Sequence, residues 1–471
     1  MAGAGRRAQR RGYRGSRVRT NRGAMTMVRH QVPIQPEAFP EIPVRSRRIL
    51  RYRREAFGWL AAYPDGRIAL FRDEAGPLLA QGAPFAAVTP YLLDRIDVTT
   101  DFHFAAPVMA WLEITRRCNL RCPHCFVEGG VARNGELSTA EILALLDGWA
   151  DMGVFSVIIT GGEPSIHRDF VRIVNHAHAL GFVVGVATNA MPLTRKLLDR
   201  LPRTDMVISV SIDGLHGQGA ARGMSDFDFA TRRIREIQEA GFNTSIMTTT
   251  HHGNVSEQHR IIAWARENGV ALRSVPFVEM GRGANNVDLA ARTEDVELAA
   301  SFWIEEELWE REHDSVLGLS ASRAFNFLLT MVYATRRCMS GRGLTYVTSN
   351  GDVFPCSTCA GNKVLCAGNL HMSSFAEIWN GAWDIRDITW DNFRTACQGC
   401  SLNADKYFCT SRCPGSSSIL NRKLDGCGAT EFQKRSTLRR EELFRERVMA
   451  NPAVYIRPEH EAAVTATETA S

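Results

Sequence analysis

Between residues 108 and 280, short apolar runs alternate with longer amphipathic stretches. The short runs are rich in β-branched residues and predict strands at Val108–Ile114, Phe155–Thr160, Phe182–Thr188, Met206–Ile212, Asn243–Thr249 and Ala271–Pro276. The longer stretches repeat apolar residues at helical spacing and predict helices at Ile142–Met152, Arg168–Leu180, Thr194–Leu201, Phe227–Ala240 and Ser256–Asn268. Ser138 and Glu141 have the spacing of a capping box before the first helix. Strands that alternate with helices form parallel sheets, so we expect an α/β fold, a partial (β/α)6 barrel of the TIM type.

Further regions are expected on both sides of this barrel domain, which we place at residues 105–290. A small N-terminal module at 46–100 should contain an extended segment at Ile49–Tyr63, a turn at Pro64-Asp65-Gly66, a returning strand at Ile68–Phe71, and helices at Asp73–Leu79 and Tyr91–Ile96. After the barrel we expect a helical connector at 291–336 and a Gly- and Cys-rich region at 337–430, held together by metal with little core of its own. Residues 431–471 should form a helix, Glu431–Met449, and a tail.

Composition indicates an ordinary globular protein, with 45% hydrophobic and 23% charged residues. The sequence contains no run of about 18 apolar residues, so no membrane span is predicted. Its first residues also lack the apolar segment of a secretory signal. Twelve cysteines in closely spaced groups indicate metal ligands in a reducing compartment rather than disulfides. We therefore expect a cytoplasmic protein that does not contact a membrane.

The first 30 residues are predicted to be a disordered arm. Residues 1–29 hold nine arginines and no acidic residue, whereas the rest of the chain has 47 basic and 51 acidic residues. Such an arm can attract nucleic acid. A disordered tail explains the arginines more simply, as does translation that begins upstream of a true first residue at Met25 or Met27. Nucleic-acid binding is not expected.

The loop after the first predicted strand carries Cys118, Cys122 and Cys125. Three thiolates can hold three irons of a [4Fe–4S] cube and leave the fourth iron open. A structural zinc site needs four protein ligands, and only His124, between two of the cysteines, is at hand. The spacing favours an iron–sulfur cluster with one open iron at the carboxyl end of the strands.

This loop resembles the signature of the radical SAM superfamily. The resemblance implies that S-adenosylmethionine binds the open iron, and that His124, at a usually aromatic position, lies near the adenine. Gly161-Gly162-Glu163-Pro164, after the second strand, resembles the family's GGEP motif, whose glycines would let the backbone approach the methionine amino group; two glycines before a proline also simply make a good turn.

Two later strand ends extend the resemblance. Thr188 and Asn189 stand where relatives have Thr-Asn-Gly, and Ala190 in place of the glycine is expected to alter the backbone. Ser209, Ser211 and Asp213 resemble a Ser-x-Asp-Gly pattern that faces the ribose and methionine, and alternation puts them on one face of the strand. Arg222 stands where relatives have an arginine for the methionine carboxylate, although the usual His-Asp before it is missing. Alternatively, these groups only bind the strand ends.

The C-terminal cysteines resemble the SPASM domain, which carries two auxiliary [4Fe–4S] clusters. The resemblance assigns the first cluster to Cys338, Cys356 and Cys413 and the second to Cys397, Cys400, Cys409 and Cys427. Cys359 or Cys366 can complete the first cluster, which otherwise keeps an iron open to substrate. A zinc ribbon of Cys397, Cys400, Cys409 and Cys413 is the alternative.

Together the resemblances imply a radical SAM enzyme that modifies a ribosomally made precursor peptide and receives electrons from a flavodoxin or ferredoxin. Residues 51–58 resemble the opening of PqqD-like peptide-recognition domains; otherwise the segment is an extension that packs on the main core. Two other functions stay open: a radical SAM maturase of a small molecule such as a tetrapyrrole or quinone cofactor, and a non-enzymatic protein that binds zinc and nucleic acid. No general base can be assigned.

Overall fold

The fold is taken from a computed structural model. It describes residues 30–33, 50–63, 67–93, 95–98, 102–215, 227–313, 324, 327–329, 331–332, 335–360, 362–400, 402 and 413–450. Of the predicted features, the Arg-rich segment 1–29, the turn at 64–66, Arg222, Cys409 and the C-terminal tail from residue 451 lie outside these ranges.

One sheet of nine strands organises the molecule, in the order β11-β10-β9-β8-β7-β6-β12-β13-β14. Its first six strands along the chain pair in parallel and are β6 Met109–Glu113, β7 Ser156–Thr160, β8 Val183–Thr188, β9 Met206–Ser211, β10 Asn243–Thr250 and β11 Ala271–Pro276. All six predicted strands are thereby confirmed. Because the strands are parallel, their carboxyl ends and the loops that follow them lie at one edge of the sheet.

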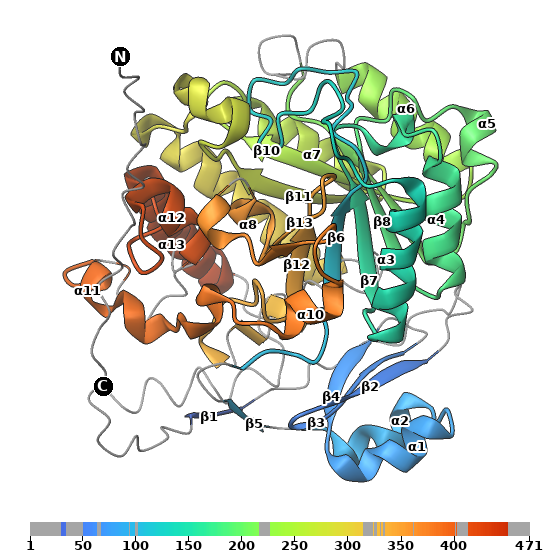
Figure 1. Ribbon diagram of the computed structural model, residues 1–471. Helices are drawn as coiled ribbons and strands as arrows, with labels where there is room; N and C mark the ends of the chain where they lie inside the picture. Colours follow the sequence, from blue (N-terminus) through green and yellow to red (C-terminus); the bar gives the residue numbers. More distant parts are fainter. Residues whose placement is uncertain are drawn as a thin grey trace, which may run out of the picture.

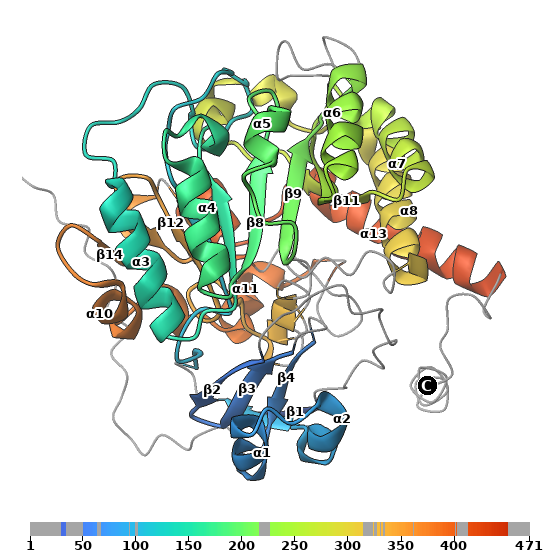
Figure 2. The same cartoon turned by 90° about the vertical axis from the view of Figure 1, so that its right-hand side faces the viewer.

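Helices between the strands cover the outer face of the sheet (Figures 1 and 2). They are α3 Thr139–Asp151, α4 Phe170–Ala179, α5 Arg195–Leu198, α6 Phe227–Glu239 and α7 Gln258–Glu267. The predicted capping box of α3 is confirmed, since the Glu141 amide donates to Ser138 Oγ and the Ser138 amide donates to the Glu141 carboxylate. The partial (β/α)6 barrel is the fold that the alternation predicts.

The Cys-rich region continues the same sheet. Its strands are β12 Leu344–Val347, parallel to β6, then β13 Asp352–Phe354 and β14 Gly368–Asn369, both antiparallel. Short helices follow at α10 Phe375–Asn380, α11 Arg394–Cys397 and α12 Pro414–Asn421. Tyr346, Trp379 and Trp383 are buried in one hydrophobic cluster with the barrel, so the apolar side chains of this region share the barrel's core, which agrees with the expectation of little core of its own. The region is therefore built onto the barrel.

Two long helices close the side of the molecule beside β11 (Figure 1). The connector forms α8, Val296–His313, and the predicted C-terminal helix is α13, Glu431–Ala450. They pack against each other, and the Arg439 guanidinium bridges them by donating to Glu297 at 2.7 and 3.1 Å. None of the helices in the described ranges has the length and apolar character needed to cross a membrane.

The N-terminal module is a three-stranded antiparallel sheet, β2 Arg51–Glu55, β3 Gly58–Ala62 and β4 Ile68–Phe71, followed by α1 Gly76–Ala80 and α2 Phe85–Val88. The prediction of one extended segment at Ile49–Tyr63 was wrong, because a turn at Ala56 and Phe57 divides it. Gly58 permits this turn: its φ is 141°, and a Cβ would lie 2.2 Å from the Phe71 carbonyl oxygen.

The prediction of a second helix at Tyr91–Ile96 was also wrong. The helical residues there end at Tyr91, Leu92 forms a β-bridge to Phe71, and β5, Arg95–Val98, pairs with β1, His30–Pro33. The returning strand and the helical segment after Asp73 are confirmed, the latter as a 3-10 turn at Asp73–Ala75 that continues into α1. Pairing with strands that are distant along the chain overrode the local helical pattern.

A buried arginine anchors this module to the barrel. Arg53 pairs with Glu55 at 2.7 Å and donates to the carbonyl oxygens of Pro107 and Gly153 at 3.0 and 2.8 Å. These carbonyls precede β6 and β7, so the module packs on the amino ends of the strands, the end of the barrel opposite the cysteine loop (Figure 2).

Candidate metal centres at the barrel mouth

The cysteine loop rests directly on the backbone of the Gly161-Gly162 segment. The amide of Gly162 donates to the Thr115 carbonyl at 2.7 Å, and that of Glu163 donates to the Arg117 carbonyl at 2.8 Å. A Cβ on Gly162 would lie 2.4 Å from the Arg117 carbonyl oxygen. These glycines were expected to let the backbone approach a cofactor, and in the structure they let it approach the cysteine loop.

A second clamp, which was not predicted from the sequence, comes from the segment after β11. Arg282 Nε donates to the Cys122 carbonyl at 2.9 Å, and its Nη1 donates to the Gly129 carbonyl at 2.8 Å. Gly281, with a φ of 53°, lets this segment approach, because a Cβ there would lie 2.3 Å from the Phe126 carbonyl oxygen. The only sequence signal was Gly-Arg-Gly after the last strand.

Within the loop, Cys122 is buried and Cys118 and Cys125 are half-buried. Backbone amides of Leu120 and Gly129 donate to the sulfurs of Cys118 and Cys125, each at 3.4 Å. Such donors favour thiolates, the form that binds metal. The three predicted ligands therefore share one rigid loop in an environment suited to metal.

Sulfur spacing separates a cluster from a single zinc ion. Tetrahedral zinc with Zn–S bonds of about 2.3 Å holds its sulfurs about 3.8 Å apart. Within the described ranges, the one set of three or more His, Cys, Asp or Glu whose ligand atoms all lie within 4.8 Å is His252, Glu294 and Asp295. In the described part of the chain no three cysteine sulfurs lie within 4.8 Å of one another, although those of Cys356 and Cys359 are 3.6 Å apart.

His124 links the cysteine loop to the end of β9. Its Nε2 lies 3.1 Å from Asp213 Oδ2, and its ring stacks on that of His251 with centroids 6.1 Å apart. Asp213 also accepts from the Thr249 amide at 2.8 Å. His124 Nδ1 is buried and has no hydrogen-bond partner among the described residues. This atom fits a hydrogen bond to a ligand in the mouth of the barrel, as the resemblance implies. His251 was not predicted; it directly follows β10.

Glu163 joins the ends of β7 and β8. Its fully buried carboxylate accepts from Ser165, from Thr188 Oγ1 at 2.7 Å and from the Asn189 amide at 2.8 Å. Burial raises the pKa of this carboxyl, and these hydrogen bonds act against that rise. Asn189 in turn donates to Asn119 in the cysteine loop at 2.9 Å. Pro164 begins the 3-10 turn that Glu163 caps.

Ala190 occupies a backbone conformation that favours glycine. Its φ is 61°, in the left-handed region, and its amide donates to Thr188 Oγ1 at 2.9 Å. This turn therefore holds alanine in a conformation that glycine adopts more readily, and the expectation of a backbone different from that of the relatives stays a prediction.

Polar side chains line one face of β9, as alternation predicts. Ser209 and Ser211 are half-buried, whereas Ile208, which precedes Ser209, and Val210, which lies between the two serines, are buried in the core. Ser209 hydrogen-bonds Ser245 of β10 at 2.7 Å. A hydroxyl-lined face beside the cysteine loop fits the sugar and amino-acid groups of S-adenosylmethionine.

Four C-terminal thiols come together between β13 and α12. They belong to Cys338, Cys356, Cys359 and Cys413, all buried or half-buried. The sulfurs of Cys356 and Cys359 lie 3.6 Å apart, and their hydrogen bond lowers the pKa of Cys356 to about 6. Burial and the neighbouring Cys338 and Cys356 raise the pKa of Cys413 to about 12. Four such thiols cannot all ionise without a cation among them, so this donor set fits a metal cluster.

The remaining cysteines lie elsewhere. Cys366 donates to the Gly368 carbonyl at 3.3 Å, beside β14. Cys397 and Cys400 share a tight turn, in which the Cys400 amide donates to the Cys397 carbonyl at 3.1 Å. Cys427 follows α12, and no contact in the described part of the chain joins it to that pair. Because Cys413 lies with Cys338 and Cys356, the geometry disfavours the zinc ribbon that would use Cys413.

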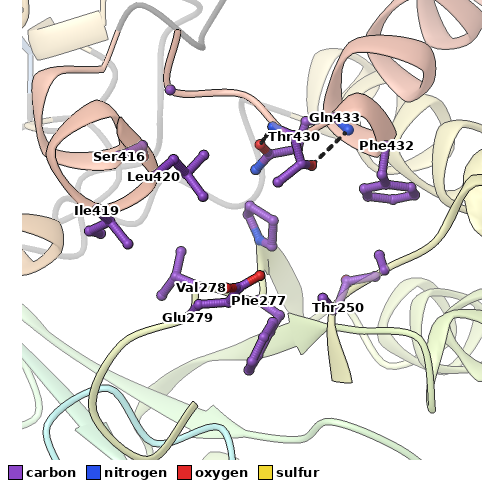
Figure 3. Close-up of a pocket in the computed structure, with 14 residues that line it drawn as sticks. Thr250, Phe277, Val278, Glu279, Ser416, Ile419, Leu420, Thr430, Phe432 and Gln433 are labelled. Carbon is purple, nitrogen blue, oxygen red and sulfur yellow. Dashed lines mark hydrogen bonds between the residues drawn. The ribbon is translucent and has the colours of Figure 1, made fainter. Parts of the chain in front are cut away.

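A pocket lies between the barrel and the Cys-rich region (Figure 3). Thr250 at the end of β10 and Phe277 and Val278 after β11 line one side, and Leu420 of α12 and Phe432 of α13 line the other. The lining is mainly apolar. Thr250 directly precedes His251, and Cys413 caps the amino end of α12. The pocket is therefore bordered by the ends of β10 and β11 and by the helix that Cys413 caps.

Comparison with known proteins agrees with both halves of this site. Residues 112–265 match the radical SAM superfamily, and residues 338–401 match the SPASM iron-sulfur cluster-binding domain. The mycofactocin maturase MftC of Mycolicibacterium smegmatis is 28% identical over 66% of this chain and 79% of its own length. The PqqA peptide cyclase of Xanthomonas euvesicatoria is 28% identical over 76% and 97%. An AdoMet-dependent heme synthase of Methanosarcina barkeri is 29% identical over 64% and 92%.

Solved structures share the fold. SuiB of Streptococcus suis, bound to S-adenosylmethionine, superposes with a TM-score of 0.55 over 71% of this chain and 88% of that protein, at 15% identity. SuiB has also been solved bound to its precursor peptide SuiA. An experimental structure therefore has the same overall fold over most of this chain.

Proposed function

We propose that this chain, which belongs to the radical SAM superfamily and carries a SPASM domain, is an enzyme that modifies a ribosomally made precursor peptide. The observation that carries the reaction class is the loop of Cys118, Cys122 and Cys125, which two glycine-dependent contacts hold at the carboxyl end of the strands. Three thiols with one position left for a ligand suit a [4Fe–4S] cluster that binds S-adenosylmethionine.

The residues of the barrel mouth would hold the cofactors. Cys118, Cys122 and Cys125 would bind the cluster, and the hydroxyls of Ser209 and Ser211 would face the S-adenosylmethionine, with Asp213 fixing His124 beside it. When bound, the reduced cluster and S-adenosylmethionine supply a 5′-deoxyadenosyl radical, which abstracts hydrogen from the substrate. The chain contributes the buried, strand-anchored site that positions the substrate and excludes water from the radical.

A role for Glu163 follows from its hydrogen bonds. One carboxylate oxygen accepts from Ser165 and Thr188, while the other accepts only from the Asn189 amide in the described structure. Glu163 would thus fix the geometry of the β7 and β8 ends, so that Asn189 reaches the cysteine loop. It acts as a positioning residue rather than as a proton donor or acceptor.

The peptide substrate is supported by the relatives and by the pocket. MftC and the PqqA peptide cyclase are named as a maturase and a peptide cyclase, and SuiB binds a precursor peptide. The pocket between β10, β11, α12 and α13 would receive an apolar part of the peptide next to the barrel mouth. A flavodoxin or ferredoxin would deliver the reducing electron.

The domain boundaries belong to the same proposal. Residues 105–290 would form the radical SAM core and 337–430 the auxiliary-cluster domain, although both share one sheet and one hydrophobic core. Residues 46–100 would be the N-terminal module. Its attachment at the amino ends of the strands favours an extension that packs on the main core, while its order of three strands followed by helices leaves a PqqD-like role as a hypothesis.

A small-molecule substrate is the second candidate, because the heme synthase is as similar in sequence as the peptide maturases. Co-expression of the full chain with each short reading frame beside its gene, followed by mass spectrometry, separates the two. We expect a mass change in one peptide that disappears when Cys118, Cys122 and Cys125 are all replaced by Ala. If no peptide changes while a porphyrin or quinone precursor is consumed, the peptide proposal is wrong.

A further inference from the structure

Two cysteines compete to be the fourth ligand of the first auxiliary cluster. Sequence spacing does not decide between Cys359 and Cys366, since both follow Cys356 within ten residues. The question matters because a cluster with four thiolates has no iron open to substrate, whereas a cluster with three has one.

A 3-10 turn directs Cys359 toward the other three thiols. The 3-10 turn comprises Ser357–Cys359, and the Cys359 amide closes it by donating to the Cys356 carbonyl at 3.1 Å. Residues three apart in such a turn lie on one side of it. The two sulfurs accordingly lie 3.6 Å apart, and Cys359 is fully buried.

The start of α12 packs onto the same sulfur from the opposite side. A Cβ on Gly415 would lie 3.1 Å from Cys359 Sγ, and Cys413, two residues earlier, is the N-cap of that helix. Cys359 is thus enclosed between Cys356, which follows β13, and the helix that carries Cys413.

Cys366 is directed elsewhere. Its thiol donates to the Gly368 carbonyl at 3.3 Å, and the neighbouring Ala367 amide pairs with the Val353 carbonyl at 2.8 Å. The backbone around Cys366 is therefore tied to the sheet edge at β13 and β14. Reaching the other thiols would break this pairing.

We infer that Cys359, together with Cys338, Cys356 and Cys413, completes the first auxiliary cluster as a four-thiolate site. This cluster then has no iron available to coordinate substrate, and the substrate contacts only protein side chains there. The inference rests on the proposed function insofar as the cluster is a [4Fe–4S] cluster.

The test uses the full chain in which Cys118, Cys122 and Cys125 are replaced by Ala, so that only auxiliary clusters form. After anaerobic reconstitution with iron and sulfide, we expect about eight irons per chain, from two [4Fe–4S] clusters. Because three thiolates can still hold a [4Fe–4S] cube with one open iron, Cys359→Ala should lower the iron count, leave a [3Fe–4S] EPR signal, or give carbon-13 hyperfine coupling when carbon-13 cyanide is added to the reduced variant. Cys366→Ala is the matched control and should leave iron content and EPR spectrum unchanged. The inference is overturned if Cys359→Ala matches its parent, or if Cys366→Ala has an equal or larger effect.

A second measurement leaves Cys359 in place and does not depend on the variant folding. Carbon-13 cyanide is added to a reduced form of the parent protein in which Cys397 and Cys400 are also replaced by Ala, so that only the first auxiliary cluster forms. It should give no carbon-13 hyperfine coupling in ENDOR spectra, because no iron of that cluster is open. Coupling in this protein would overturn the inference. Formation of 5′-deoxyadenosine by the unmutated enzyme is independent of both results, so the inference and the proposed function can fail separately.

Discussion

Arg282 Nε lies 2.9 Å from the carbonyl oxygen of Cys122, although 160 residues separate the two in the sequence. The same guanidinium reaches the Gly129 carbonyl at 2.8 Å, so one side chain joins the middle of the cysteine loop to the residues that follow Cys125. The segment after the last barrel strand thereby holds a loop that follows the first strand.

Replacing Arg282 should loosen this loop. Arg282→Gln removes hydrogen bonds from a charged donor and should cost about 1–3 kcal/mol of unfolding free energy, together with a lower iron content of the primary cluster. Denaturant unfolding and iron analysis of full-length protein measure both. Arg195→Gln, which breaks an exposed pair with Asp199, is the control and should change stability by less than about 1 kcal/mol. Equal effects of the two substitutions would contradict the clamp.

Gly162→Ala should displace the cysteine loop, because its Cβ would lie 2.4 Å from the Arg117 carbonyl oxygen. We expect a loss of about 1–3 kcal/mol and little 5′-deoxyadenosine formation. Gly148→Ala is the matched control: this glycine lies in α3 with no neighbouring atom within 4 Å of an added Cβ, so alanine should stabilise by about 0.5–1 kcal/mol. A Gly162→Ala enzyme as stable and as active as the unmutated one would show that the contact is not required.

Glu163→Gln tests the link between β7 and β8. The buried carboxylate accepts from Thr188 and from the Asn189 amide, and an amide NH2 would face one of these donors. We expect a loss of about 1–3 kcal/mol in thermal unfolding and weaker binding of S-adenosylmethionine in equilibrium dialysis. Glu239→Gln, at an exposed site on α6, should change neither. Unchanged binding in Glu163→Gln would remove its positioning role.

Ala190 offers a test of backbone strain. Glycine relieves a left-handed conformation that costs an L-residue about 1–2 kcal/mol, but it loses a buried methyl worth about 0.8 kcal/mol and gains freedom in the unfolded chain. Ala190→Gly should therefore lie within about 1 kcal/mol of neutral, whereas Ala190→Val, β-branched at a φ of 61°, should destabilise by more. Denaturant unfolding ranks them. A Val variant as stable as the Gly variant would be inconsistent with the observed φ.

The barrel was predictable because each strand is a short apolar run and each helix repeats apolar residues at its own period. The strand of residues 206–211 shows this well, since Ser209 and Ser211 alternate with buried neighbours. The second N-terminal helix was not predictable, because Leu92 pairs with Phe71, 21 positions away, and no local pattern encodes that bridge.

Within the site, cysteine and glycine motifs were visible because their chemistry depends on spacing within one loop. Arg282 and His251 were not, because their partners lie on other strands and loops. Cys359 and Cys366 could not be ranked by spacing either. The choice depends on a 3-10 turn that directs Cys359 inward and on sheet pairing that directs Cys366 away.

The central claim is that Cys118, Cys122 and Cys125 hold a cluster that cleaves S-adenosylmethionine reductively. The most direct test is chromatographic quantification of 5′-deoxyadenosine after anaerobic incubation of the reconstituted full chain with S-adenosylmethionine and dithionite. The account predicts 5′-deoxyadenosine from the unmutated enzyme and none from the variant in which all three cysteines are Ala. Equal amounts from both proteins, or none from an unmutated enzyme with its full iron content, would contradict it.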